Sequence, residues 1–232
     1  MSVILVGNGE SLLGSNMGEV IDSYDTVVRF DGLNIEGYEK DVGTKTDILV
    51  LDSFVFLKYM KSGFDDVRDE LYDIDEIWIM PNDKVYDEMA ISFNNEFKNL
   101  KLIDYYNYKE SLGYFKQGEC NTEGSNFISN ELYAILSLMQ TNTNFKVIGM
   151  DFININLNLA EMECVFEDNL LLEGNSFIHD NWGFHWKLND TFKTYYSDLY
   201  WGFNNSTSII LELKIMKILK EIGLIKILEV ER

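Results

Sequence analysis

The sequence is poor in cysteine, histidine and proline, and each of these shortages excludes a class of protein. Its two cysteines, Cys120 and Cys164, are too few for a disulfide-stabilised scaffold. Together with only two histidines, they also form no recognisable set of zinc ligands. The single proline, Pro81, and the absence of any Gly/Ser-rich stretch leave no candidate linker, so we expect one domain over residues 1–232.

Positive charge is also scarce, because 19 Lys and Arg residues face 39 Asp and Glu residues and give a net charge of -20. A chain this acidic lacks the basic surface that binds nucleic acid or an anionic membrane, so we expect neither as a partner. No basic and apolar leader opens the chain, and no apolar run approaches the ~20 residues that cross a membrane. These absences, together with the scarcity of cysteine, predict a cytoplasmic protein. Its negative charge is expected to keep it soluble.

Hydrophobic residues make up 46% of the chain, which is enough to bury a core, and they fall in short β-rich runs that alternate with helical spacings. The β-rich runs predict strands at residues 3–6, 26–30, 47–51, 76–80, 100–103, 145–148 and 226–230. The helical spacings predict helices at residues 54–61, 83–97, 126–140 and 207–222. This alternation predicts a Rossmann-like three-layer α/β/α sandwich with a mostly parallel sheet. Such folds bind ligands at the carboxyl ends of their strands, near the point where the strand order reverses.

The first predicted strand runs directly into Gly7, Asn8 and Gly9, followed by Ser11 two positions later. Two glycines let the backbone approach a ligand closely, and free N–H groups in such a turn suit a phosphate. The spacing is neither a Walker loop nor a dinucleotide fingerprint, because no Gly-Lys-Ser/Thr follows and no third glycine stands at the required place. A tight turn in which Asn8 caps the backbone explains the same residues without any ligand.

A longer pattern extends from this turn, because residues 6–31 read VGNGESLLGSNMGEVIDSYDTVVRFD and residues 36–46 read EGYEKDVGTKT. This pattern resembles the large sialyl motif of glycosyltransferase family 29, the sialyltransferases, and its opening GNGES also resembles the bacterial family 42 sialyltransferases. The positions in register with the family motif are Gly18, Ile21, Asp22, Asp25, Val27, Arg29, Gly37, Tyr38, Glu39, Asp41, Val42, Gly43, Lys45 and Thr46. Generic α/β patterning would reproduce the apolar positions of this set but not the polar ones, so the resemblance is specific. It implies a sialyltransferase-type fold and a single glycosyltransferase-like domain.

In the family this segment holds the cytidine monophosphate (CMP) part of the donor, CMP-sialic acid. The resemblance therefore implies that Gly7, Asn8, Gly9 and Ser11 serve the donor, with Asn8 in contact with the nucleotide phosphate or ribose. The family has Asn where this chain has Asp31. An acidic residue there can bind a hydroxyl group but repels a phosphate, which leaves the identity of the donor open.

Arg29 is also a donor-binding candidate by resemblance. It has a second explanation, as a buried structural partner of Asp22 or Asp25, and both explanations stay open at this point.

A second segment resembles the small sialyl motif, which is a Ser/Thr-Gly turn, a helix and a strand ending in a glycine turn. Here Gly124, Ser125 and Asn126 open the helix predicted at 126–140, and Asp151 follows the strand predicted at 145–148. A glycine and a hydroxyl at a helix N-terminus suit a phosphate, so the resemblance implies donor-binding roles for these four residues. A plain helix cap at Ser125 is the structural alternative.

The only two histidines, His179 and His185, lie in an aromatic segment that also contains Asp180 and Asp190. A neutral imidazole can take a proton from a sugar hydroxyl, and a neighbouring carboxylate can orient it. The closing motif of the family is a His followed five positions later by Glu, and His185 with Asp190 has that spacing. The resemblance implies His185 as the general base and His179 as a contact of the leaving phosphate. The roles can be exchanged, because His179 stands next to Asp180, and packed structural histidines are the alternative.

The resemblance thus implies an inverting, metal-independent glycosyltransferase without a cofactor. It would transfer sialic acid or a related sugar from a CMP-activated donor to a glycan hydroxyl, so its partners would be a nucleotide-sugar donor and a glycan acceptor. Two alternatives remain: a transferase that uses another sugar nucleotide on the same scaffold, and a binding module for a nucleotide or partner that has lost catalysis. Binding of CMP, UMP and GMP separates the three. The oligomeric state stays open.

Overall fold

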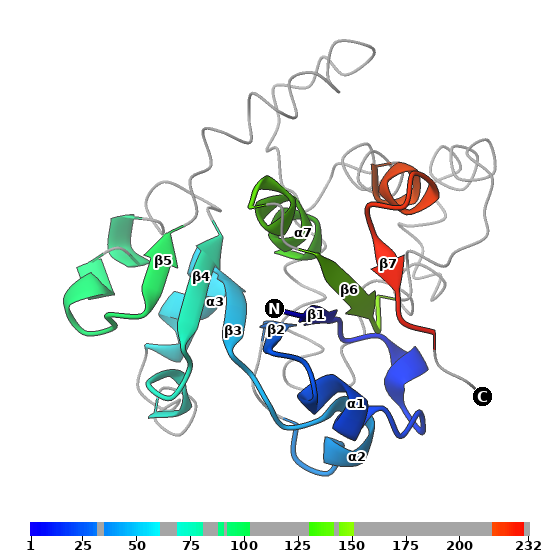
Figure 1. The fold of residues 1–232 in the computed structure, drawn as a ribbon. Helices are drawn as coiled ribbons and strands as arrows, with labels where there is room; N and C mark the ends of the chain where they lie inside the picture. The colour runs from blue at the N-terminus through cyan, green and yellow to red at the C-terminus, as the bar shows by residue number, and fades with distance from the viewer. Residues whose placement is uncertain are drawn as a thin grey trace, which may run out of the picture.

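The structure is a computed structural model, and it describes residues 1–31, 35–60, 69–80, 88–90, 92–102, 130–141, 144–150 and 215–229. In these ranges a seven-stranded sheet forms the centre of the molecule, and helices lie on both of its faces (Figure 1). None of the helices in these ranges combines the length and the apolar character that a membrane crossing requires.

The strands pair in parallel, in the spatial order β5-β4-β3-β2-β1-β6-β7. Their bounds are β1 Val3–Val6, β2 Thr26–Phe30, β3 Ile48–Asp52, β4 Glu76–Met80, β5 Leu100–Leu102, β6 Phe145–Ile148 and β7 Lys226–Ile227. The central strands β1 and β2 are buried along their whole length. Helices on both faces of a parallel sheet require this, because both sets of alternating side chains then point into a core.

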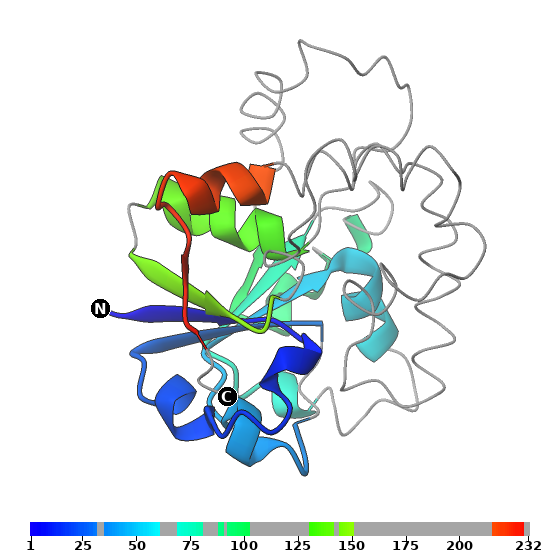
Figure 2. The same ribbon diagram turned by 90° about the vertical axis from the view of Figure 1, so that its right-hand side faces the viewer.

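The helices and turns used below are η1 Glu10–Leu12, α1 Gly18–Asp22, α2 Glu39–Val42, α3 Ser53–Tyr59, α7 Asn130–Gln140 and a helix at residues 215–221. Figure 2 shows α7 and the helix at residues 215–221 on one side of the sheet, and α1 and α2 on the other. Ile135 of α7 packs in one core cluster with Val28 of β2, whereas Ile21 of α1 packs in another with Val27. Neighbouring residues of β2 thus enter opposite cores, which confirms the predicted three-layer sandwich.

Four of the predicted strands, at 3–6, 26–30, 76–80 and 145–148, have the predicted bounds, and those predicted at 47–51 and 226–230 differ. β3 begins and ends one residue later than predicted. Asp47 directly precedes it, and its carboxylate accepts a hydrogen bond from the Val27 N–H of β2 at 2.6 Å. β5 is described only as far as Leu102. Of the strand predicted at 226–230, Lys226–Ile227 are in β7, whereas residues 228 and 229 are not in a strand. Among the described residues, β7 lies at the edge of the sheet and pairs with β6.

The predicted helices are confirmed in part. The helix predicted at 54–61 is α3, and those predicted at 126–140 and 207–222 are described from residues 130 and 215 onward.

The helix predicted at 83–97 is wrong in its last part, where η2 (Ser92–Asn95) is a 3-10 turn. This turn brings Phe93 and Phe97 against the same partner, Phe56, with ring centroids 5.8 Å apart in both pairs.

The strand order reverses at β1. From β1 the chain adds β2 to β5 on one side of the sheet and then places β6 and β7 on the other side. The carboxyl ends of β1 and β6 therefore flank the topological switch point, where ligands of parallel α/β folds bind. We refer to residues 7–9, Asp31, and residues 149–150, which directly follow β1, β2 and β6, as the switch-point edge.

Candidate functional site

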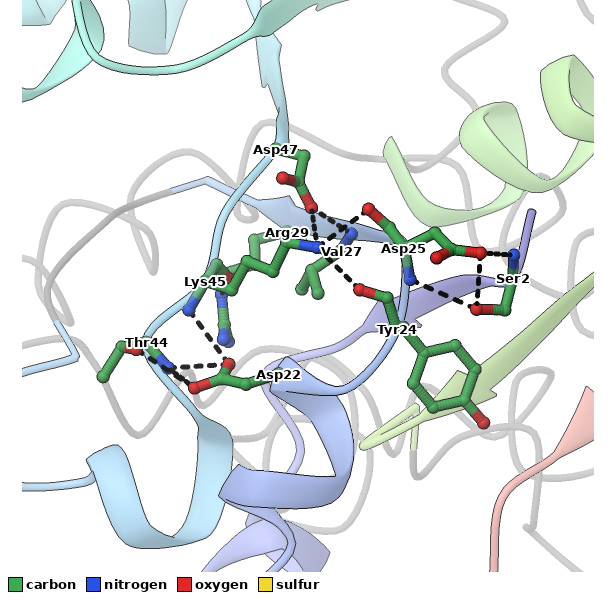
Figure 3. Close-up of polar contacts among 9 residues, drawn as sticks. All are labelled: Ser2, Asp22, Tyr24, Asp25, Val27, Arg29, Thr44, Lys45 and Asp47. Carbon is green, nitrogen blue, oxygen red and sulfur yellow. Dashed lines mark hydrogen bonds and ion pairs between the residues drawn. The ribbon is translucent and has the colours of Figure 1, made fainter.

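The polar residues that carry the family resemblance fall into two groups at opposite edges of the sheet. The first group lies before β2 and β3, at the amino ends of these strands, and Figure 3 shows its contacts. The Asp22 carboxylate accepts hydrogen bonds from the Thr44 backbone N–H at 2.9 Å, from the Thr44 hydroxyl at 3.0 Å and from the Lys45 N–H at 3.0 Å. These bonds tie the end of α1 to the segment that enters β3.

The Lys45 ammonium continues this network toward β2. It donates to the Tyr24 and Asp25 carbonyl oxygens at 2.6 and 2.8 Å, and it lies 3.3 Å from the Asp47 carboxylate. Asp25 in turn accepts a hydrogen bond from the Ser2 N–H at 2.6 Å. These motif residues therefore join the amino ends of three strands, away from the edge at which ligands bind.

Arg29 lies in β2 and its side chain has no exposed surface. Its Nε donates to the Lys45 carbonyl oxygen at 3.0 Å and one terminal nitrogen donates to the Val42 carbonyl oxygen at 2.6 Å, while the other is buried without a partner. Burial lowers the pKa of the guanidinium to about 10, and the charges of Asp22 and Asp47 oppose this shift. This geometry supports the structural explanation of Arg29, with Asp22 among its electrostatic partners, and its contact with the donor stays a prediction.

The second group of motif residues lies at the switch-point edge. The backbone N–H of Gly7 donates to the Ile148 carbonyl oxygen at 2.8 Å, and that of Gly9 donates to the Gly149 carbonyl oxygen at 2.7 Å. These two N–H groups are therefore used within the sheet, and the contact of the glycines with the donor stays a prediction. Both N–H groups extend the pairing of β1 with β6, and the chain continues through η1, where Ser11 is half-buried.

Asn8 is the residue at this edge with an unsatisfied polar atom. Its side chain is only 6% exposed, and its Nδ2 reaches the Phe30 carbonyl oxygen at the long distance of 3.4 Å. Its Oδ1 is buried and has no hydrogen-bond partner. Buried acceptors without partners are rare in folded proteins, because each one loses its bonds to water without replacing them. Asn8 therefore presents an acceptor that a bound ligand can satisfy.

Asp31 follows β2 directly, and the β1–β2 register of Val6 with Arg29 places it beside Asn8. Its Oδ1 accepts a hydrogen bond from the Asn130 Nδ2 at 2.7 Å. Its backbone carbonyl accepts one from the Tyr59 hydroxyl at 2.6 Å. The structure thus brings together two of the predicted donor residues, Asn8 and Asp31, and adds two side chains from α7 and α3.

Asn130, Tyr59 and Ser53 are polar residues at these strand ends that the sequence reasoning missed. Ser53 follows β3 and its hydroxyl is fully buried without a partner. For Asn130 a signal exists, because it stands four residues after Asn126 and such residues share one face of a helix. For Ser53 the signal is its position at the carboxyl end of an apolar strand.

The other predicted site residues lie outside the described residues, and their roles stay predictions. They are Gly124, Ser125, Asn126, Asp151, His179, His185 and Asp190. Within the part of the chain that the structure describes, no three or more His, Cys, Asp or Glu side chains come together in a way that could hold a metal ion.

Comparison with known proteins finds sialyltransferases, the family that the sequence motif resembles. Residues 2–116 match the model of glycosyltransferase family 29 (sialyltransferase). The chicken (Gallus gallus) alpha-N-acetylgalactosaminide alpha-2,6-sialyltransferase 1 is 59% identical over 46 residues, which are 20% of this chain and 8% of that protein. The human CMP-N-acetylneuraminate-beta-1,4-galactoside alpha-2,3-sialyltransferase is 34% identical over 102 residues, which are 44% of this chain and 22% of that protein. The matches thus span less than a quarter of the length of these relatives.

The solved structures extend the likeness in fold over almost the whole chain. The crystal structure of a mammalian sialyltransferase in complex with Gal-beta-1-3GalNAc-ortho-nitrophenol superposes with a TM-score of 0.54. That likeness covers 99% of this chain and 70% of that one at 15% identity, so it supports the shared fold alone. The predicted resemblance is confirmed: residues 2–116 of this chain belong to glycosyltransferase family 29, the sialyltransferases.

Proposed function

We propose that this chain is a glycosyltransferase that transfers sialic acid or a related sugar from a CMP-activated donor to a glycan hydroxyl. One observation carries the proposal: within the matched family segment, Asn8 and Asp31 lie side by side at the switch-point edge, and the Asn8 Oδ1 is buried there without a partner. Parallel α/β folds bind nucleotides at this place, so the nucleotide part of the donor is assigned to it.

The chemistry follows from the groups that the transfer requires. A base removes the proton of the acceptor hydroxyl while its oxygen attacks the anomeric carbon, and the bond from that carbon to the nucleotide phosphate oxygen breaks. In-line displacement of this kind inverts the configuration. We assign the base to His185, oriented by Asp190, and the stabilisation of the leaving phosphate to His179, Ser125 and the backbone near Gly124.

No metal or cofactor is part of this proposal. The leaving phosphate is stabilised instead by hydrogen-bond donors and an imidazole, which carry partial or full positive charge.

Two other functions make different predictions about nucleotide binding. A transferase with another sugar nucleotide is suggested by Asp31, which stands where the family has Asn. A binding module without catalysis is suggested by the net charge of -20, which disfavours an anionic donor.

Calorimetry with CMP, UMP and GMP, combined with a transfer assay on His185→Ala, tests the proposal. We expect CMP to bind at least tenfold more tightly than UMP or GMP, and His185→Ala to bind CMP normally but to lose transfer. Preference for UMP or GMP favours the other transferase. If the protein binds none of the three nucleotides, the transferase proposal ends, and a non-catalytic module that binds another kind of partner is favoured.

A further inference from the structure

We propose that the corner of the molecule beside the amino end of β7 docks on an anionic lipid surface. We refer to this surface as the β7 corner. It consists of three exposed apolar side chains and three exposed lysines, which are Ile218, Ile222, Leu224, Lys146, Lys220 and Lys226. The contact is peripheral, at the head groups of a bilayer, and it does not depend on the proposed function.

The apolar part of the β7 corner is the end of the helix at residues 215–221 and the turn that leads into β7 (Figure 1). Ile218 and Ile222 stand four positions apart, which places them on one side of the helix, and they are 47% and 61% exposed. Leu224 in the turn is 48% exposed. Large aliphatic side chains that gather at one surface mark a contact with another apolar phase.

Two hydrogen bonds close the turn that carries these side chains. The Gly223 N–H donates to the Lys220 carbonyl oxygen at 3.0 Å, and the Leu224 N–H donates to the Leu219 carbonyl oxygen at 2.9 Å. The φ of Gly223 is 77°, the left-handed value that this type of helix end requires. Leu224 is thereby held at the tip of the turn, close to the last turn of the helix and to the start of β7.

Lysines flank this apolar tip. Lys226 begins β7 and pairs in register with Lys146 of β6, so the two side chains lie on the same face of neighbouring strands. Both are exposed, and no described residue forms an ion pair with either of them. Like charges at this separation repel each other, and an anionic surface in front of them relieves the repulsion. Lys220 adds a third exposed ammonium from the helix.

The net charge of -20 argues against an anionic membrane for the surface as a whole but not for this corner. At physiological ionic strength charges are screened over about 8 Å, so an approaching bilayer interacts mainly with the nearest groups. Within residues 214–226 four lysines accompany one acidic residue, Glu221. Apolar side chains with lysines beside them are the combination that binds the interface of an anionic bilayer.

A bilayer suits the β7 corner better than a second copy of the chain. A stable dimer buries ~800 Å² on each partner, and three partly exposed aliphatic side chains provide only a fraction of that area. A twofold contact would also bring the lysines of one copy toward those of the other. The switch-point edge lies at the opposite ends of the strands, so docking at the β7 corner leaves it unobstructed.

Sedimentation with lipid vesicles tests the apolar part of the proposal. The vesicles are phosphatidylcholine alone and a mixture of phosphatidylcholine with phosphatidylserine. The variant Ile222→Ser with Leu224→Ser removes the apolar tip, and Leu13→Ser with Val20→Ser is its matched control. Both control residues are 42% exposed, and Val20 belongs to α1 on the other side of the sheet (Figure 2).

A second pair of variants tests the charges. Lys220→Gln with Lys226→Gln removes two lysines of the β7 corner, and Lys40→Gln with Lys98→Gln removes two exposed lysines elsewhere. Each lysine near an anionic surface is expected to contribute about fivefold to the affinity. The two controls therefore compare a loss of the same groups at different places on the molecule.

The wild type is expected to bind the mixed vesicles at least tenfold more tightly than phosphatidylcholine alone, and added salt should weaken this binding. Removal of the apolar tip, or of Lys220 and Lys226, should weaken binding to the mixed vesicles about tenfold or more. The two control variants should bind the mixed vesicles within about twofold of the wild type.

Three results would overturn the proposal. The first is a wild type that does not bind the mixed vesicles, and the second is equal binding by the β7-corner variants and their controls. The third is a wild-type dimer in light scattering that becomes a monomer in Ile222→Ser with Leu224→Ser, without vesicle binding, because the corner is then an interface between copies. If that variant does not fold, the lysine variants decide: a loss confined to Lys220→Gln with Lys226→Gln supports lipid docking, and equal binding overturns it.

Discussion

Gly7 and Gly149 approach so closely at the ends of β1 and β6 that a Cβ on Gly7 would lie 2.3 Å from the Gly149 carbonyl oxygen. Two hydrogen bonds fix this approach, from the N–H of Gly7 to Ile148 and from that of Gly9 to Gly149. The first glycine of the motif is therefore required by the protein's own backbone, and this contact determines where Asn8 lies.

Replacement of Gly7 by Ala is expected to destabilise the fold. The added methyl group meets backbone atoms, which cannot move aside as a flexible side chain can, so we expect a loss of about 3 kcal/mol in the free energy of unfolding by urea. Gly223→Ala is the control, because its φ of +77° is strained for Ala but nothing lies within 4 Å of the new Cβ. Its cost should be about 1 kcal/mol. A Gly7→Ala protein as stable as the control would show that the two turns are not in contact.

The buried Arg29 leads to a second prediction, which separates folding from binding. Arg29→Ala leaves the Val42 and Lys45 carbonyl oxygens without their donor and opens a cavity beside β2. We expect the free energy of unfolding to fall by at least about 3 kcal/mol, while the folded fraction binds CMP as the wild type does. Arg29→Lys keeps the charge but cannot span both carbonyl groups, so its stability should be intermediate.

A loss of CMP affinity in a stably folded Arg29→Lys protein would instead indicate that the guanidinium contacts the donor. Lys146→Ala, at an exposed position of β6, is the surface control and should change neither property.

The sheet could be predicted from the sequence because strands 3–6, 26–30 and 145–148 are apolar runs that end at a glycine or a polar residue. Such local patterns follow from burial on both faces of a parallel sheet. The division of the motif between two edges could not be predicted. Asp22 and Asn8 belong to one continuous sequence pattern, but the direction of the strands places them at opposite ends.

The Asp31–Asn130 pair shows a second limit of the sequence. Asp31 stood out as a departure from the family, yet its partner is 99 positions away on a helix whose apolar face alone was predicted. A hydrogen bond between such distant positions depends on the packing of α7 over the sheet, which the local spacing does not specify. The same holds for Tyr59, whose hydroxyl bonds to Asp31 from the opposite layer.

A third prediction concerns the dependence of stability on pH. Burial raises the pKa of Glu76, but hydrogen bonds from Lys101 and Trp78 outweigh burial and hold it below its ordinary value of 4.5. A carboxyl group with a lowered pKa in the folded state stabilises the fold above pH 4.5, and this contribution is lost as the pH falls through the folded-state pKa. Because the pair with Lys101 is partly exposed, the loss should be below about 1 kcal/mol.

Urea unfolding at about pH 6 and about pH 3.5 measures this contribution. Glu76→Gln removes the titrating group, so its stability should change less between the two pH values than that of the wild type. Lys101→Met should reduce the change in the same way, and the double variant should add nothing further. Equal changes in all four proteins would mean that β4 and β5 are not joined by this pair.

The last prediction uses the unsatisfied acceptor of Asn8. Asn8→Ala removes an Oδ1 that has no partner and one long hydrogen bond to Phe30, so the free energy of unfolding should change by less than about 1 kcal/mol. If a ligand satisfies this oxygen, CMP affinity should fall about tenfold or more in the same variant. Calorimetry and urea unfolding on one preparation give both values.

Asn99 provides the matched control, because its half-buried amide nitrogen has hydrogen-bond partners. Its Nδ2 donates to the carbonyl oxygens of Leu71 and Ile74, which it ties to the start of β5. Asn99→Ala should therefore lose about 1–2 kcal/mol of stability and leave CMP affinity unchanged. The two Asn→Ala substitutions thus have opposite expected effects, one on binding and one on stability. An Asn8→Ala protein that loses stability but binds CMP normally would assign Asn8 to the fold and remove the nucleotide from the switch-point edge.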